Sequence, residues 1–93
     1  MSTATARHIL VTERERCEDI KNKIESGDDF SDMASQFSEC PSGQRGGDLG
    51  EFQPGMMVKE FDDVVFSEAL GMVHGPIETQ FGFHLIEITS RTD

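Results

Sequence analysis

The side chains best suited to chemistry in this sequence of 93 residues are one cysteine and two histidines. Cys40 opens a run of turn-forming residues, 40–50, that holds four of the nine glycines, while His8 and His84 lie near the two ends of the chain. A cysteine brought beside a histidine can be a nucleophile with its base. The three side chains also suit zinc, although no paired ligand spacing supports a zinc site. A turn-rich run is equally typical of a plain surface connection, so these alternatives stay open on the residues alone.

Both histidines fall in segments whose apolar pattern predicts β-strands. Residues 7–11 are nearly continuous in apolar, β-branched side chains, which is typical of a short buried strand. Residues 81–89 give the strongest strand signal, and their alternation places His84 on one face with Ile86 and Ile88. A strand histidine is more often a satisfied buried residue than a functional one, so the pattern fixes position and not role.

Two helices are predicted between the first strand and the loop. Thr12 followed by Glu15 forms a capping-box signature that starts the first helix, and Gly27 ends it as a left-handed residue. Its apolar stripe includes Cys17, which we interpret as a small buried hydrophobe. Asp28 or Asp29 caps the second helix. Apolar side chains then recur at a spacing typical of a core-facing helix: Phe30, Met33, Ala34 and Phe37.

The second half of the chain completes an α+β pattern. Residues 48–52 are expected to form a short strand that closes the loop, and residues 58–65 carry the apolar spacing of a third helix. Gly75 and Pro76 are expected to break the chain before the final strand. The order predicts one α+β domain over residues 1–93, ordered from about 6 to 90, with a small, mainly antiparallel sheet flanked by helices.

The net charge of −10 limits the possible partners. Residues 1–26 are balanced, whereas residues 27–93 hold thirteen acids against three basic residues. Nucleic acid and anionic membranes require clustered Lys and Arg, so neither is expected as a partner. A neutral or cationic polypeptide suits the charge better. The sequence shows no apolar stretch of membrane-spanning length and no disulfide pattern, which indicates a reducing, cytoplasmic location.

At several points the sequence resembles the parvulins, which are peptidyl-prolyl cis–trans isomerases. The resemblance covers residues 6–90 and rests on five motifs in order: His8-Ile9-Leu10-Val11, Phe30-x-x-Met33-Ala34, Ser38-Glu39-Cys40-Pro41-Ser42 running into Gly46-Gly47-Asp48-Leu49-Gly50, Met57-x-x-x-Phe61, and Thr79-Gln80-Phe81-Gly82-Phe83-His84-Leu85-Ile86. It implies a βα₃βαβ₂ fold, with a four-stranded antiparallel sheet and four helices, one of them a short helix around residues 42–46. The first and last strands should be central neighbours, which puts His8 beside His84.

The resemblance also assigns a site. It implies a catalytic group with Cys40 hydrogen-bonded through a neutral histidine pair, and Thr79 supporting that pair. The full set of catalytic residues is His8, Cys40, Thr79 and His84. It implies a proline pocket made of Leu49, Met57, Phe61 and Phe81. Met57 and Phe61 share a helix face only if the helix begins by residue 57.

Rotation about an X-Pro bond must overcome a barrier of about 18–20 kcal/mol without making a bond, so no cofactor and no metal is expected. The expected substrates are proline-containing peptides or unfolded protein clients, bound by a monomer. The alternatives are a chaperone-like binder of extended segments and, third, a thiol hydrolase using Cys40. The glycines of residues 40–50 are expected to let the backbone lie close to an extended substrate.

The junction after the first strand, Thr12-Glu13-Arg14-Glu15, is short and half acidic. Recognition of phosphoserine before proline needs an Arg cluster, so we expect no phosphate preference and a better fit for neutral or basic residues.

Overall fold

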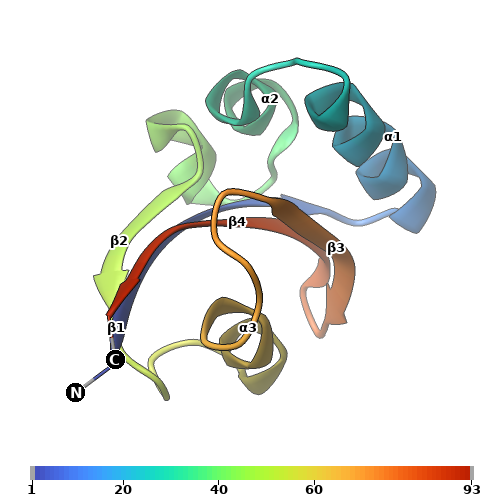
Figure 1. The fold of residues 1–93 in the computed structure, drawn as a ribbon. Helices are drawn as coiled ribbons and strands as arrows, with labels where there is room; N and C mark the ends of the chain where they lie inside the picture. The colour runs from blue at the N-terminus through green and yellow to red at the C-terminus, as the bar shows by residue number, and fades with distance from the viewer. Residues whose placement is uncertain (1, 93) are drawn as a thin grey trace.

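A four-stranded antiparallel sheet organises the chain in the computed structural model, which describes residues 2–92 (Figure 1). Along the chain the elements are β1 (Thr3–Val11), α1 (Arg14–Glu25), α2 (Phe30–Phe37), the 3₁₀ helix η1 (Pro41–Arg45), β2 (Asp48–Phe52), α3 (Lys59–Val65), β3 (Val73–Thr79) and β4 (Gly82–Thr92). The strand order is β2-β1-β4-β3, so the first and last strands lie at the centre, as expected. The α+β prediction is confirmed: three of the four expected helices are α-helices, and the short helix expected around residues 42–46 is the 3₁₀ helix η1.

The helices cover the two faces of the sheet separately (Figure 1): α1 and α2 lie over one face and α3 lies over the other. Alternate residues of the central strands therefore enter two different cores. Ile9 and Leu85 pack under α1 and α2, whereas Ile86 and Ile88 pack against α3. His8 and His84 belong to the α3 face, because the ring of Phe61 contacts both of them.

Local signals placed most helix ends correctly, but the predicted capping box is wrong. Helix α1 begins after Glu13, which makes no side-chain cap, and the N–H of Thr12 donates instead to the Glu39 carboxylate. A long-range acceptor has therefore replaced the local one. The cap of α2 is Asp29, whose Oδ2 accepts the N–H of Asp32 at 3.1 Å. Gly27 has the expected positive φ, and Cys17 is fully buried, which raises the pKa of its thiol to about 11.

Two further expectations need correction, and the structure decides the position of Met57, which the sequence left open. Strand β1 begins at Thr3 and not at residue 7, because it pairs with the end of β4 as far as Thr92. Gly75 and Pro76 lie inside β3, where the pairing with β4 shifts its register around them. Met57 precedes α3, whose first residue is Lys59. Within residues 2–92 no helix is both long and apolar enough to cross a membrane.

Candidate active site

An almost wholly apolar cavity of about 390 Å³ opens on the α3 face of the sheet. Five separate segments build it: the middle of β1, the loop that runs into η1, strand β2, the segment that leads into α3 together with α3 itself, and the β3–β4 turn with the start of β4. Its lining residues are His8, Leu10, Glu39, Cys40, Pro41, Leu49, Met57, Val58, Phe61, Phe81 and His84. A cavity of this size and character suits a small apolar ring, because burial there costs no polar contact.

The structure brings together seven of the eight predicted site residues as lining of this cavity: His8, Cys40, Leu49, Met57, Phe61, Phe81 and His84. Thr79 lies one step behind, where its Oγ1 is 2.8 Å from Nε2 of His84. Met57 reaches the cavity from the segment before α3, so it does not share a helix face with Phe61.

The two histidines form a buried, hydrogen-bonded pair. They come from diagonal positions of the paired strands β1 and β4, and their Nδ1 atoms are 3.2 Å apart. The other ring nitrogen of each histidine meets a hydroxyl: Nε2 of His8 is 3.0 Å from Oγ of Ser42, and Nε2 of His84 meets Thr79. A chain Ser42–His8–His84–Thr79 results. With both rings neutral, every member is satisfied when one histidine carries its proton on Nδ1 and the other on Nε2, in either order, whereas two protonated rings would face each other with N–H groups.

Burial keeps this pair neutral. It lowers the pKa of His8 from 6.5 to about 4, with the neighbouring His84 as a second cause. Burial also lowers the pKa of His84, although Glu60 opposes that shift. The pair therefore offers polar, uncharged groups at the floor of the cavity at neutral pH.

Ser42 is the residue that the sequence missed, and it corrects the expected role of Cys40. Both ring nitrogens of His8 are engaged by His84 and Ser42, so His8 does not hydrogen-bond Cys40. Ser42 is 4% exposed, whereas Cys40 is half-buried at the cavity wall. The only sequence signal for Ser42 was its place in the turn-rich run, where a serine is ordinarily a turn residue.

This geometry bears on the two alternative roles of Cys40, as a nucleophile and as a zinc ligand. A nucleophilic thiol needs an adjacent base, and neither histidine of the cavity has a free ring nitrogen to act as one. Among the described residues, no group of three or more His, Cys, Asp or Glu side chains is arranged to hold a metal ion. The arrangement supports a polar neighbour to the substrate, not a covalent centre.

Phe61 joins the apolar wall to the histidine pair. Its ring meets His8 edge-on at 5.7 Å between centroids and His84 at 6.1 Å, and it also packs on Phe52 at 6.1 Å. It is 3% exposed, so both the cavity and the α3 core depend on it.

Gly47 allows a close backbone approach within the protein itself, while the expected close approach of an extended substrate to residues 40–50 stays a prediction. Gly47 has φ +84°, and a Cβ at that position would lie 2.4 Å from the carbonyl oxygen of His8. Its own carbonyl accepts the N–H of His8 at 3.0 Å. Glycine here lets the loop close onto β1 and fixes the backbone that carries His8.

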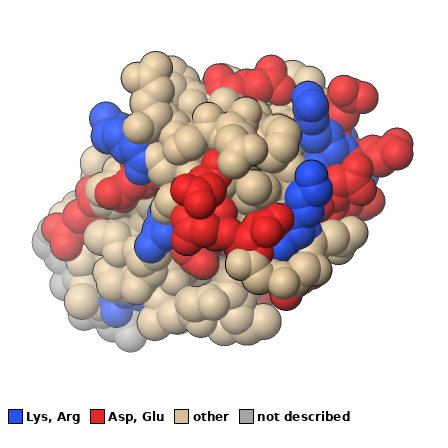
Figure 2. Space-filling model, turned by 90° about the horizontal axis from the view of Figure 1, so that it is seen from above, with Lys and Arg blue, Asp and Glu red and all other residues tan. Residues whose placement is uncertain are grey.

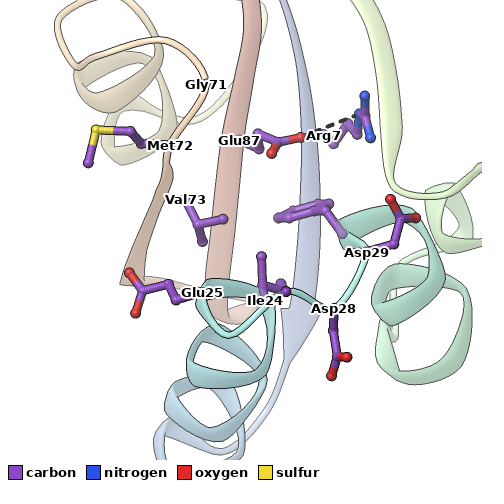
Figure 3. Close-up of a pocket in the computed structure, with 11 residues that line it drawn as sticks. Arg7, Ile24, Glu25, Asp28, Asp29, Gly71, Met72, Val73 and Glu87 are labelled. Carbon is purple, nitrogen blue, oxygen red and sulfur yellow. Dashed lines mark ion pairs between the residues drawn. The ribbon is translucent and has the colours of Figure 1, made fainter.

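A second, larger cavity of about 600 Å³ lies on the other face of the sheet, between the α1–α2 corner and the segment before β3 (Figure 3). Unlike the apolar cavity, it is lined by several charged side chains. Figure 3 shows the Arg7–Glu87 ion pair, 3.6 Å long, at the sheet and Asp28 and Asp29 at the α1–α2 corner. A charged lining has no affinity for a proline ring, so we assign the site to the smaller cavity although the charged one is larger.

Disrupting the histidine pair should produce strongly non-additive changes in stability. Either His8→Leu or His84→Leu leaves a buried partner unpaired, which costs about 1–3 kcal/mol. The double variant removes both partners, so its cost should fall short of the sum by about 1–2 kcal/mol. Urea denaturation of the four proteins measures this coupling, and strict additivity would contradict the paired arrangement.

A neutral polar pair at the floor of an apolar, ring-sized cavity suits a protein that binds a peptide through proline. The comparisons identify the family. A sequence model described as the PPIC-type PPIASE domain matches residues 2–92. A foldase protein PrsA from Geobacillus sp. (strain WCH70) is 44% identical over 89 residues, which are 95% of this chain and 32% of that protein.

Solved structures agree. The crystal structure of the peptidylprolyl isomerase PrsA from Bacillus anthracis matches with a TM-score of 0.95 at 33% identity, over 99% of this chain and 43% of that one. The solution structure of NmPin, the parvulin of Nitrosopumilus maritimus, matches with a TM-score of 0.86 at 35% identity, over 97% and 98% of the two chains. The chain belongs to the parvulin family of peptidyl-prolyl cis–trans isomerases. It spans about a third of the length of the PrsA relatives that it matches.

Proposed function

We propose that residues 2–92 suffice for catalysis of X-Pro rotation in unfolded or flexible polypeptides. The observation that carries the proposal is the apolar cavity set directly against the neutral, buried histidine pair. The proline ring occupies the wall formed by Leu49, Met57 and Phe61. The carbonyl of the preceding residue lies toward Cys40.

The cavity favours the twisted amide over the planar one. Rotation removes amide resonance, so the carbonyl becomes less dipolar and the nitrogen pyramidal. A planar, strongly dipolar amide loses more by leaving water than a twisted one does. An apolar cavity therefore binds the transition state better than the ground state, and that difference lowers the barrier.

Exchange spectroscopy on a short Leu-Pro peptide tests this proposal. The result expected of an isomerase is that a small, catalytic amount of the protein increases the cis–trans exchange rate of the peptide. A chaperone-like binder is the second candidate, favoured by the 58% exposure of Phe81 at the cavity. A binder would shift the peptide resonances without accelerating exchange, and that result would overturn the proposal.

Cys40→Asp is expected to retain most of the isomerase activity, within about tenfold in kcat/KM. The reason is that Cys40 lies at the cavity wall without a histidine base, so its role is polar rather than covalent. The same exchange measurement checks this variant, with circular dichroism as a control for folding. Complete loss of activity in a folded Cys40→Asp protein would favour the nucleophile, as would an acyl adduct trapped on Cys40.

We also propose that phosphoserine before proline gives no advantage. Arg14 at the β1–α1 junction lies 3.6 Å from Glu18, and the junction brings no Arg cluster to the cavity. A peptide series in which phosphoserine-proline ranks first would contradict this.

Three further properties remain proposals. On the face in Figure 2 the Lys and Arg side chains alternate with acids and form no continuous basic patch, which supports a function without nucleic acid or anionic membranes. The two free cysteines support a reducing, cytoplasmic location. A monomer is proposed because the cavity is complete within one chain. Light scattering and cell fractionation test the last two.

A further inference from the structure

Glu39 stands out in the cavity because its carboxylate is the one formally charged group among the lining residues. The remaining lining is apolar apart from the thiol and the two neutral histidines. Among the described residues, Glu39 takes part in none of the three ion pairs. Arg14, the first arginine after β1, is paired with Glu18. A negative charge therefore borders the cavity without a cation at ion-pair distance among the described residues.

The position of this carboxylate is fixed by its surroundings. Oε2 of Glu39 accepts the N–H of Thr12 at 3.2 Å, and the N–H of Glu39 donates to the carbonyl oxygen of Leu10 at 2.7 Å. On one side of it in sequence, Oγ of Ser38 accepts the N–H groups of Leu10 and Cys40. The segment before η1 is thereby tied to β1, so the charge is held beside the cavity and does not move freely in solvent.

The direction of the substrate places one particular side chain near this charge. With the proline ring against Met57 and Phe61, the X-Pro carbonyl lies at Cys40, and that carbonyl belongs to the residue before proline. Glu39 is the chain neighbour of Cys40 and lines the same cavity. In the proposed orientation, the residue before proline therefore lies within reach of the Glu39 carboxylate.

We propose that Glu39 determines specificity for the residue before proline and selects Lys or Arg there. This inference rests on the proposed function for its substrate class and orientation, and it adds the residue that makes the choice. A cationic side chain gains the attraction of a fixed carboxylate, whereas Glu, Asp or phosphoserine meets a like charge that takes part in no ion pair. Because Glu39 is exposed to solvent, the attraction is screened and the expected effect is modest.

The test compares three peptides that differ only before proline: Lys-Pro, Leu-Pro and Glu-Pro. Exchange spectroscopy gives kcat/KM for each, expressed relative to Leu-Pro. The wild type should prefer Lys-Pro over Glu-Pro by about five- to tenfold at low salt, and less at high salt. Glu39→Gln keeps an acceptor for the Thr12 N–H and should reduce this ratio about two- to fivefold, and Glu39→Lys should reverse it.

A matched control is Glu13→Gln, which makes the same change of charge at the N-cap of α1 but does not line the cavity. It should leave the Lys-Pro to Glu-Pro ratio at the wild-type value. If Glu39→Gln changes all three peptides by one factor, Glu39 only fixes the β1–α1 junction and the proposal is overturned. An equal change of the ratio in the Glu13 variant would overturn it as well, because net charge would then explain the preference.

Affinities of the same peptides, measured by chemical-shift titration, separate this proposal from the proposed function. Absence of catalysed exchange with tighter, Glu39-dependent binding of Lys-Pro would reject the isomerase and support the specificity. Catalysed exchange with equal rates and affinities for all three peptides would reject the specificity and leave the isomerase standing.

Discussion

Phe61→Ala is expected to lower the free energy of unfolding by about 3–5 kcal/mol and kcat/KM by about 10- to 100-fold. The stability loss follows from removal of a ring that is 3% exposed and packs in the α3 core. The loss of activity follows because the same ring forms the cavity wall against His8 and His84, and an apolar wall contributes about 1.5–3 kcal/mol to binding a buried ring. Denaturation in urea and exchange spectroscopy measure the two quantities.

Phe30→Ala is the matched control for that prediction. Phe30 has the same 3% exposure but packs in the other core, under α1 and α2, away from the cavity. It should lose a similar amount of stability and keep its kcat/KM at a temperature where the protein remains folded. If Phe61→Ala does not fold, Phe61→Leu retains much of the volume and should still lose activity. Equal activity losses in the Phe30 and Phe61 variants would show that Phe61 acts only through stability.

The fold was readable from the sequence where one local pattern decided the outcome. The alternation in β4 separates the side chains that face α1 and α2 from those that face α3, and the structure confirms both sets. The spacing of Phe30, Met33 and Ala34 likewise marks a buried helix face. These signals hold because burial of a periodic apolar face is a property of the segment itself.

The sequence failed where a distant group replaced a local partner. Thr12 should have capped α1 by its own side chain, but its backbone is bound to Glu39, which lies 27 positions away. Gly75 and Pro76 should have broken the chain, but the pairing of His74 and Ile77 with β4 on either side of them keeps β3 continuous across a shift in register. Local propensity gives way here because cross-strand hydrogen bonds supply what the segment lacks.

The candidate site was likewise predictable only in part from the sequence. The residue types around the cavity were foreseen through the resemblance, and seven of them do line it. The hydrogen-bond partner of His8 was not foreseen, since only the three-dimensional path of η1 brings Ser42, and not Cys40, to Nε2. Whether Ser42 or Cys40 faces His8 depends on the backbone geometry of a turn, and apolar periodicity in the sequence does not predict that geometry.

Acid should destabilise this protein through the histidine pair before most carboxylates titrate. The folded-state pKa of His8 is lowered from 6.5 to about 4, so between these values the unfolded chain binds a proton that the folded chain does not. Stability then rises with pH over that window and falls as the pH is lowered through it. The depression corresponds to about 3 kcal/mol of stability that is present at pH 7 and lost by about pH 4.

Urea denaturation at a series of pH values from 7.5 to 4 measures this loss, and two variants assign it to the pair. His8→Leu removes the titrating group, so its stability should depend less steeply on pH between 6.5 and 5, where glutamate and aspartate in the unfolded chain are still ionised. His74→Gln removes a histidine that binds the Ala69 carbonyl outside the pair, and it serves as the control for the loss of one histidine. If His8→Leu keeps the wild-type slope, the acid sensitivity arises elsewhere and the pair does not carry the cost of burial. If the slope flattens only in His8→Leu, the acid sensitivity arises because the folded protein keeps the histidine pair neutral. The uncharged floor of the proline cavity then follows from the same burial that makes the protein sensitive to acid.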